Sequence, residues 1–172
     1  MMKRYLLSLI LAFTATGAMA VDGYKEVKFG SSFEAMRSAG LCDFQIASKQ
    51  PEHKNIVMYN CLDFQFDGNH TMAAASFIGG KFGKLQIMVD SPVNSVLEAL
   101  YKKYGAPSSS STEEEMQNAI ITGNPIYVRF DKDTVILKVE RVNKIDLVSL
   151  NYVSPDFELS VKEKTQKITD DI

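Results

Sequence analysis

The residues of this sequence that could do chemistry are few, and they match no established catalytic pattern. Its two cysteines, Cys42 and Cys61, lie too far apart for the Cys-x-x-Cys arrangement of redox pairs. In an oxidising compartment an even pair of cysteines is typical of a disulfide. We therefore predict a structural disulfide between Cys42 and Cys61, with a catalytic thiol as the less favoured alternative.

The two histidines, His53 and His70, each lie in a predicted turn. A metal site would have to combine a histidine with Asp63 or Asp67, and the spacing of these residues matches no metal-ligand motif. Solvated turn residues are the simpler interpretation. We predict no metal site.

The remaining polar candidates have structural explanations. Asp63 and Asp67 flank a predicted hairpin turn, whereas Glu113 and Glu115 lie where the first turn of a helix favours acids. The serine run 108–111 lacks the Gly-x-Ser-x-Gly setting of a nucleophilic serine. The sequence therefore predicts no catalytic residue and no cofactor.

The cysteines are positioned by a predicted hairpin of strands 41–48 and 55–62, centred on Pro51-Glu52. The two-residue period of a half-exposed sheet places apolar side chains on one face of both strands. Farther along, Phe64 and Phe66 change phase, which predicts a β-bulge near Cys61-Leu62. The predicted cross-strand pairs are Cys42 with Cys61, Phe44 with Tyr59, and Ile46 with Val57.

Capping signals predict three helices elsewhere in the chain. One begins at the capping box of Ser31 and Glu34 and ends at Gly40, and another runs from Ser91-Pro92 to Gly105. A third, over 113–121, follows Thr112, with extended structure as the alternative. Further strands are predicted at 24–29, 71–78, 85–89, 126–130, 134–141 and 145–153, with turns at 67–69 and 79–83 and a last helix from Ser154-Pro155.

These elements predict an α+β protein with antiparallel sheets and packed helices. Residues 21–172 have the length of a single domain. Within it, 21–107 and 112–172 each pair a strand meander with a helix that begins at Ser-Pro. We predict two related helix-plus-meander halves, joined by a flexible segment at 106–111.

Residues 1–20 are predicted to be a cleaved signal peptide, because Lys3-Arg4 precedes an apolar run and the triplet Ala18-Met19-Ala20. The following sequence is polar and offers no cysteine for a lipid anchor, so no stable membrane anchor is predicted. Cleavage removes two of the 19 basic residues and none of the 21 acidic ones, which leaves a net charge near −4. This acidic balance disfavours nucleic acid as a partner.

Several local motifs resemble those of small uncharacterised exported proteins of Gram-negative bacteria. They are Phe29-Gly30-Ser31, the cysteine pair, Gly80-Lys81, residues 100–107 and Tyr152-Val153-Ser154-Pro155. The resemblance covers most of the mature chain and implies no activity. A fainter similarity is to the helix-plus-antiparallel-sheet modules of outer-membrane assembly lipoproteins and secreted β-lactamase inhibitors.

The sequence thus favours a periplasmic or secreted binding module over an enzyme. We expect a non-enzymatic inhibitor, immunity-type protector or envelope accessory protein, with another envelope protein as its partner. Tyr24, Phe82 and Tyr127 fall at or beside turns or strand starts, which makes them the candidate partner-binding residues. The alternative is a small periplasmic hydrolase acting on a cell-envelope substrate.

Overall fold

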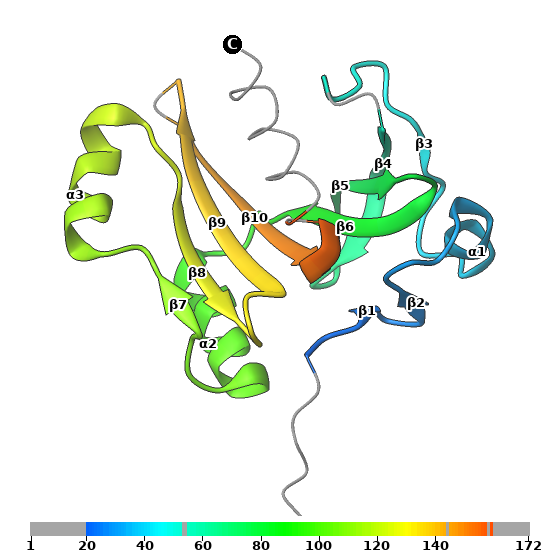
Figure 1. Ribbon diagram of the computed structural model, residues 1–172. Helices are drawn as coiled ribbons and strands as arrows, with labels where there is room; N and C mark the ends of the chain where they lie inside the picture. The colour runs from blue at the N-terminus through cyan, green and yellow to red at the C-terminus, as the bar shows by residue number, and fades with distance from the viewer. Residues whose placement is uncertain (1–19, 53–54, 144, 158, 160–172) are drawn as a thin grey trace, which may run out of the picture.

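A computed structural model describes residues 20–52, 55–143, 145–157 and 159. Its main feature is an antiparallel sheet of eight strands, with a separate two-stranded sheet and helices packed around it (Figure 1). The predicted α+β class is confirmed. The elements are β1 (Gly23–Tyr24), β2 (Val27–Lys28), α1 (Phe33–Ser38), β3 (Gln45–Ile46), β4 (Ile56–Phe66), β5 (Asn69–Ile78), β6 (Lys81–Met88), α2 (Val93–Tyr104), β7 (Ser109–Ser110), α3 (Glu113–Thr122), β8 (Ile126–Phe130), β9 (Val135–Val142) and β10 (Ile145–Val153).

The strand order of the large sheet is β3-β4-β5-β6-β10-β9-β8-β7. It reads as two four-strand runs that meet at the antiparallel pair β6 and β10, where Leu150 pairs with Ile87. The predicted halves 21–107 and 112–172 thus share one continuous sheet. A common origin of the halves stays a prediction.

One face of the sheet carries the main hydrophobic core. Phe64, Phe77, Phe82 and Phe130 are each at most 2% exposed, and Met36 of α1 is fully buried with them. Helix α2 contributes Val96 and Leu100 to the same cluster, and β1 and β2 contribute Tyr24 and Val27. Burial of this apolar surface is the main source of stability.

The hairpin that carries the cysteines differs from its predicted register. Strand β3 has two residues, and it pairs Gln45 with Asn60 and Ile46 with Tyr59. The predicted partner of Ile46 was Val57, so the register is shifted by two residues. A shift of two residues does not by itself change which face a side chain is on, and Phe44 is buried as expected. Ile46, which was expected on the same buried face, is 67% exposed, because the two-residue strand β3 lies at the edge of the sheet.

The predicted β-bulge is confirmed. The pairing of β4 with β5 shifts register between Cys61 and Phe64. Because of this shift, Cys61 and Phe64 both point into the core, at 2% and 1% exposure, whereas Leu62 is 79% exposed.

Helices α2 and α3 agree with their predicted spans. The short helix α1 begins one residue later than predicted. Ser32, not Ser31, caps α1 by accepting the amide of Ala35. Helix α3 has the predicted capping box between Thr112 and Glu115. At α2 the residue preceding the helix is Pro92, with no side-chain cap.

Two predicted loops are corrected. The segment predicted as a flexible joint contains β7, an edge strand in which Ser109 pairs with Arg129. The predicted turn 79–83 ends at Gly80, and β6 begins at Lys81. Gly83 is needed inside that strand because a Cβ there would overlap the ring of Phe157.

Two sequence predictions fall partly outside the described residues. The signal peptide does so except for Ala20, and the last helix can be followed only from Pro155 to Phe157 and at Leu159. Among the helices in the described part of the chain, none combines the length and hydrophobicity that crossing a bilayer requires.

Candidate functional site

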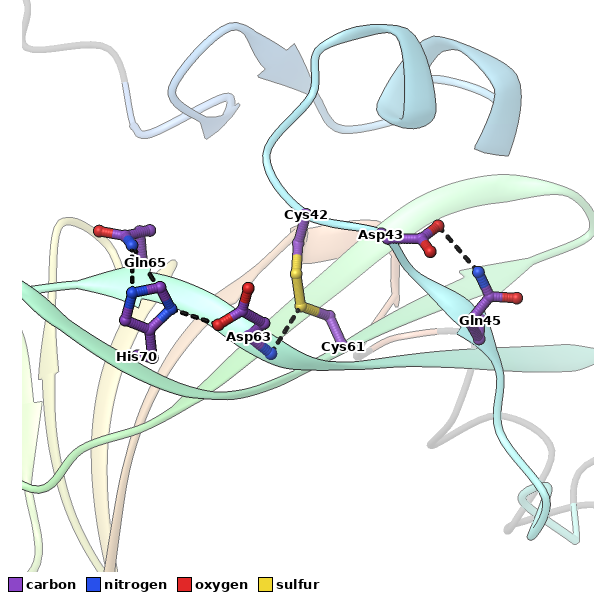
Figure 2. Close-up of a disulfide and its surroundings, with 7 residues drawn as sticks. All are labelled: Cys42, Asp43, Gln45, Cys61, Asp63, Gln65 and His70. Carbon is purple, nitrogen blue, oxygen red and sulfur yellow. Dashed lines mark hydrogen bonds and ion pairs between the residues drawn. A yellow bond between two sulfur atoms is a disulfide. The ribbon is translucent and has the colours of Figure 1, made fainter.

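The two cysteines form a disulfide that links the segment before β3 to the middle of β4 (Figure 2). Their Cα atoms are 6.3 Å apart and their sequence separation is 19 residues. Cys61 is buried, and its Sγ accepts a hydrogen bond from the amide of Asp63 at 3.4 Å. The predicted pairing is confirmed, and its surroundings are those of a structural cross-link.

Beside the disulfide, the imidazole of His70 lies between Asp63 and Gln65 (Figure 2). Nδ1 of His70 contacts Oδ1 of Asp63, and Nε2 lies 2.7 Å from the side-chain amide of Gln65. A carboxylate that orients an imidazole is one part of a hydrolytic triad. Here the second ring nitrogen faces an amide instead of a hydroxyl or thiol nucleophile, so the cluster ties β4 to β5.

The other polar candidates contribute to local structure. Asp67 accepts a hydrogen bond from the hydroxyl of Ser91 at 2.8 Å. Ser108 and Ser109 both donate to Oδ1 of Asp133, at 2.6 and 3.0 Å, which fastens the start of β7 to the turn between β8 and β9. In the part of the chain that the structure describes, no group of three metal-ligating side chains occurs. His53 lies outside it.

Of the three aromatic residues predicted to bind a partner, two are in the core. Tyr24 is 9% exposed and packs edge-on against Tyr152, and burial raises the pKa of its hydroxyl. Phe82 is 1% exposed and packs against Phe29 and Phe77. Both side chains are directed inward, and little of either is left to contact a partner. A surface that binds a partner has to be sought elsewhere.

Tyr127, the third of these residues, lines a groove of about 630 Å³ between α3 and strands β7 and β8. The guanidinium carbon of Arg129 lies 4.6 Å from the centroid of its ring. Glu115 and Asn118 line the groove from the helix side. Helix α3 thus turns polar side chains toward its own sheet.

The apolar side chains of α3 are exposed. Met116 is 43% exposed, Ile120 69% and Ile121 86%, and α3 has no buried residue. Met116 and Ile120 are four positions apart, so they share a face of the helix, which lies away from the groove-lining Glu115 and Asn118. In Figure 1, α3 stands beside the β7–β8 side of the sheet, and no described helix or strand packs on the side of α3 that faces away from the sheet.

A second group of exposed apolar side chains lies on the β9–β10 hairpin. Val142, Ile145 and Leu147 are 42%, 63% and 38% exposed. Helix α3 ends beside this hairpin: a Cβ added to Gly123, the residue after the helix, would lie 3.6 Å from the carbonyl oxygen of Arg141. We call Met116, Ile120 and Ile121 with these three hairpin residues the α3 surface.

Charge around the α3 surface is mostly negative. The first turn of α3 carries Glu113, Glu114 and Glu115, and its last turn has no basic residue. On the hairpin, Arg141 is neutralised by a two-bond ion pair with Asp146, with N···O distances of 2.7 and 2.8 Å. The α3 surface is therefore an apolar patch with an acidic border.

Sequence reasoning missed Met116, Ile120 and Ile121 as surface residues. Their spacing predicts a helix, but an apolar stripe on a helix normally faces the core. The one sequence signal was the run of three acids directly before Met116, which makes this helix unusually polar at its start.

The fold and the site define a class: a disulfide-linked α+β protein built on one antiparallel sheet, with an exposed apolar helix at its edge. The chain belongs to a protein family described as "Uncharacterised protein", whose match spans residues 24–171. The resemblance to uncharacterised proteins expected from the sequence motifs is thereby confirmed.

Two relatives are similar over most of their length. An uncharacterised protein of Haemophilus influenzae (strain ATCC 51907 / DSM 11121 / KW20 / Rd) is 30% identical over 169 residues, which cover 95% of each chain. An uncharacterised protein of Pasteurella multocida (strain Pm70) is 25% identical over 141 residues, covering 77% of this chain and 71% of the relative. No solved structure matches the chain.

Proposed function

We propose that this protein is an exported, non-enzymatic module that binds another envelope protein through the α3 surface. The observation that carries the proposal is the orientation of α3, which exposes Met116, Ile120 and Ile121 while its polar side lines the groove. Large exposed apolar patches on a small protein mark interaction sites, and α3 exposes three large apolar side chains.

The energetics of α3 support this proposal. A helix of 10 residues is marginal in water by itself, because nucleation is costly and few hydrogen bonds repay it. Its capping box and its αL glycine, Gly123, supply local stability, but no side chain of α3 is buried against the sheet. A partner that covers Ile120 and Ile121 would supply the missing burial, worth about 1.5–3 kcal/mol for each large aliphatic side chain.

The charges define the chemistry of the partner. Glu113 and Glu114, in the first turn of α3, precede the apolar side chains and do not line the groove, so the complementary surface is an apolar patch flanked by lysine or arginine. Such a border steers the encounter and excludes acidic partners, whereas the aliphatic centre supplies most of the affinity.

Export is the second part of the proposal. It is supported by the predicted signal peptide 1–20 and by the disulfide, since disulfides persist mainly outside the reducing cytosol. Mass spectrometry of the protein isolated from the periplasm should find Val21 as the first residue. Full-length protein in the cytosol with both thiols alkylated would contradict export.

The binding proposal is tested by capture from envelope extract with matched variants. Ile120→Glu places a charge in the α3 surface, and Leu62→Glu places one at another exposed aliphatic residue, on the bulge of β4 near the other end of the strand order. We expect the wild type and Leu62→Glu to retain the same protein in near-stoichiometric amount, and Ile120→Glu to lose it at least tenfold.

Two outcomes would contradict this proposal. One is equal retention by all three proteins, which would place the interaction elsewhere. The other is turnover of a cell-wall or peptide substrate by the wild type, which would favour the hydrolase.

A further inference from the structure

A second cavity, separate from the α3 surface, lies between α2 and strand β10 on the core side of the sheet. Its volume is about 400 Å³, which falls within the range of small-molecule pockets, about 300–1,000 Å³. It is lined by Phe66, Asp67, Ser91, Ser95, Val96, Ala99, Leu100, Lys103, Tyr104, Leu150 and Tyr152.

The inner wall of the cavity is apolar. Leu100 and Leu150 are 4% and 3% exposed, and Val96 is 8% exposed. Together with Phe66 from the end of β4, these three residues form an apolar surface. Water makes few hydrogen bonds with such a surface, so an apolar ligand group can bury itself there without breaking hydrogen bonds between water and the protein.

The polar groups lie at opposite ends of the cavity. At one end the carboxylate of Asp67 accepts a hydrogen bond from the hydroxyl of Ser91. At the other end is Lys103, eight residues after Ser95 on α2, which corresponds to about 12 Å along a helix. The ammonium of Lys103 lies 5.0 Å from the centroid of the Tyr104 ring, and it is the one cation among the lining residues.

Tyr104 and Tyr152 bring two hydroxyl groups to the lining of the cavity. Burial raises the pKa of Tyr152, and the adjacent Tyr104, hydrogen-bonded to it, raises it further. The hydroxyl of Tyr152 therefore stays neutral, so it can donate a hydrogen bond to an anion and adds no negative charge to the cavity.

We propose that this cavity binds a small amphiphilic anion, with an apolar chain against Leu100 and Leu150 and a carboxylate or similar group paired with Lys103. The carboxylate of Asp67 fixes the orientation, because it repels an anionic group from the opposite end. This inference is independent of the proposed protein partner, since no lining residue belongs to the α3 surface.

Isothermal titration of the mature protein with octanoate and with octanol tests the inference. Octanoate should bind saturably with one site per chain, and more tightly than octanol. Lys103→Gln should weaken octanoate binding about three- to fivefold, the effect of losing one exposed ion pair, and should leave octanol unchanged. Lys102→Gln removes the neighbouring cation of α2, which does not line the cavity, and should change neither ligand.

Ala99→Phe fills the cavity from α2 and should weaken both ligands at least tenfold, with an unchanged circular dichroism spectrum as the check of folding. The inference is overturned if octanoate shows no saturable binding, if Lys102→Gln weakens it as much as Lys103→Gln does, or if a folded Ala99→Phe protein binds both ligands as the wild type does.

Discussion

The disulfide between Cys42 and Cys61 acts at the level of single residues, yet it secures an otherwise weak edge of the sheet. Strand β3 contributes only two paired residues, Gln45 and Ile46, so few backbone hydrogen bonds hold it to β4. A cross-link between residues 19 positions apart lowers the conformational entropy of the unfolded chain. In the chain-entropy model this raises the free energy of unfolding by about 3 kcal/mol. The bond therefore compensates for the short β3–β4 pairing.

Loss of this bond gives the first prediction. Replacing both Cys42 and Cys61 by alanine should lower the free energy of unfolding by about 3 kcal/mol, as measured by urea denaturation. Reducing agent should lower the stability of the wild type to a similar degree and leave the double variant unchanged. A wild-type protein that is equally stable with and without reductant would show that the bond contributes nothing.

The ion pair of Arg141 and Asp146 on the β9–β10 hairpin gives a second prediction at this scale. The hydrogen bonds from Arg141 hold the pKa of Asp146 below its ordinary value. A lowered pKa means that the pair stabilises the folded state above the ordinary aspartate pKa, near 3.9, and that this stabilisation is lost as the pH falls through the lowered value.

NMR titration of the Asp146 carboxyl checks this prediction. In Arg141→Gln the pKa of Asp146 should rise toward its ordinary value, whereas Lys138→Gln, which removes a cation that pairs with Glu140 instead, should leave it unchanged. An Asp146 pKa that is the same in all three proteins would contradict the assigned cause.

Among the elements, the bulge in β4 decides which side chains enter the core. It turns Phe64 inward while Leu62 stays 79% exposed. Phe64→Ala should therefore lower the free energy of unfolding by about 3–5 kcal/mol, whereas Leu62→Ala should change it by less than about 0.5 kcal/mol. Similar losses in the two variants, measured by denaturant unfolding, would mean that the strand continues without a bulge.

The elements that local signals define could be predicted from the sequence. Helices α2 and α3 follow their spacing and capping residues, and the bulge follows from the phase change between Cys61 and Phe64. The register of β3 on β4 could not be predicted, because the long connection leaves the alignment of the strands open by two residues. Strand β7 was missed because Ser109 and Ser110 gain their pairing from Arg129 and Val128, which are distant in sequence.

The candidate site was predicted less well, for a physical reason. Sequence patterns place aromatic residues at turns without showing which side of the turn is buried, and so Tyr24 and Phe82 were expected on the surface. The exposed face of α3 reverses the usual rule for amphipathic helices. Only the structure reveals that Ile120 and Ile121 have no neighbours to cover them among the described residues.

At the scale of the whole molecule, the two proposed binding regions lie on different parts of one sheet. The cavity beside α2 lies on the core side of the sheet and is lined by Leu150 and Tyr152 of β10, whereas Met116, Ile120 and Ile121 lie on α3, next to β7 and β8. No residue both lines the cavity and belongs to the α3 surface, so Ile120→Glu should leave octanoate binding unchanged and Lys103→Gln should leave the protein contact of α3 unchanged.

The central claim, that α3 contacts another envelope protein, is tested most directly by photo-crosslinking in cells. A photoreactive amino acid at position 120 should form an adduct with one other protein, and the same group at position 62 should form none. Absence of any adduct at positions 116 and 120, or an adduct only with a second copy of this chain, would contradict the account.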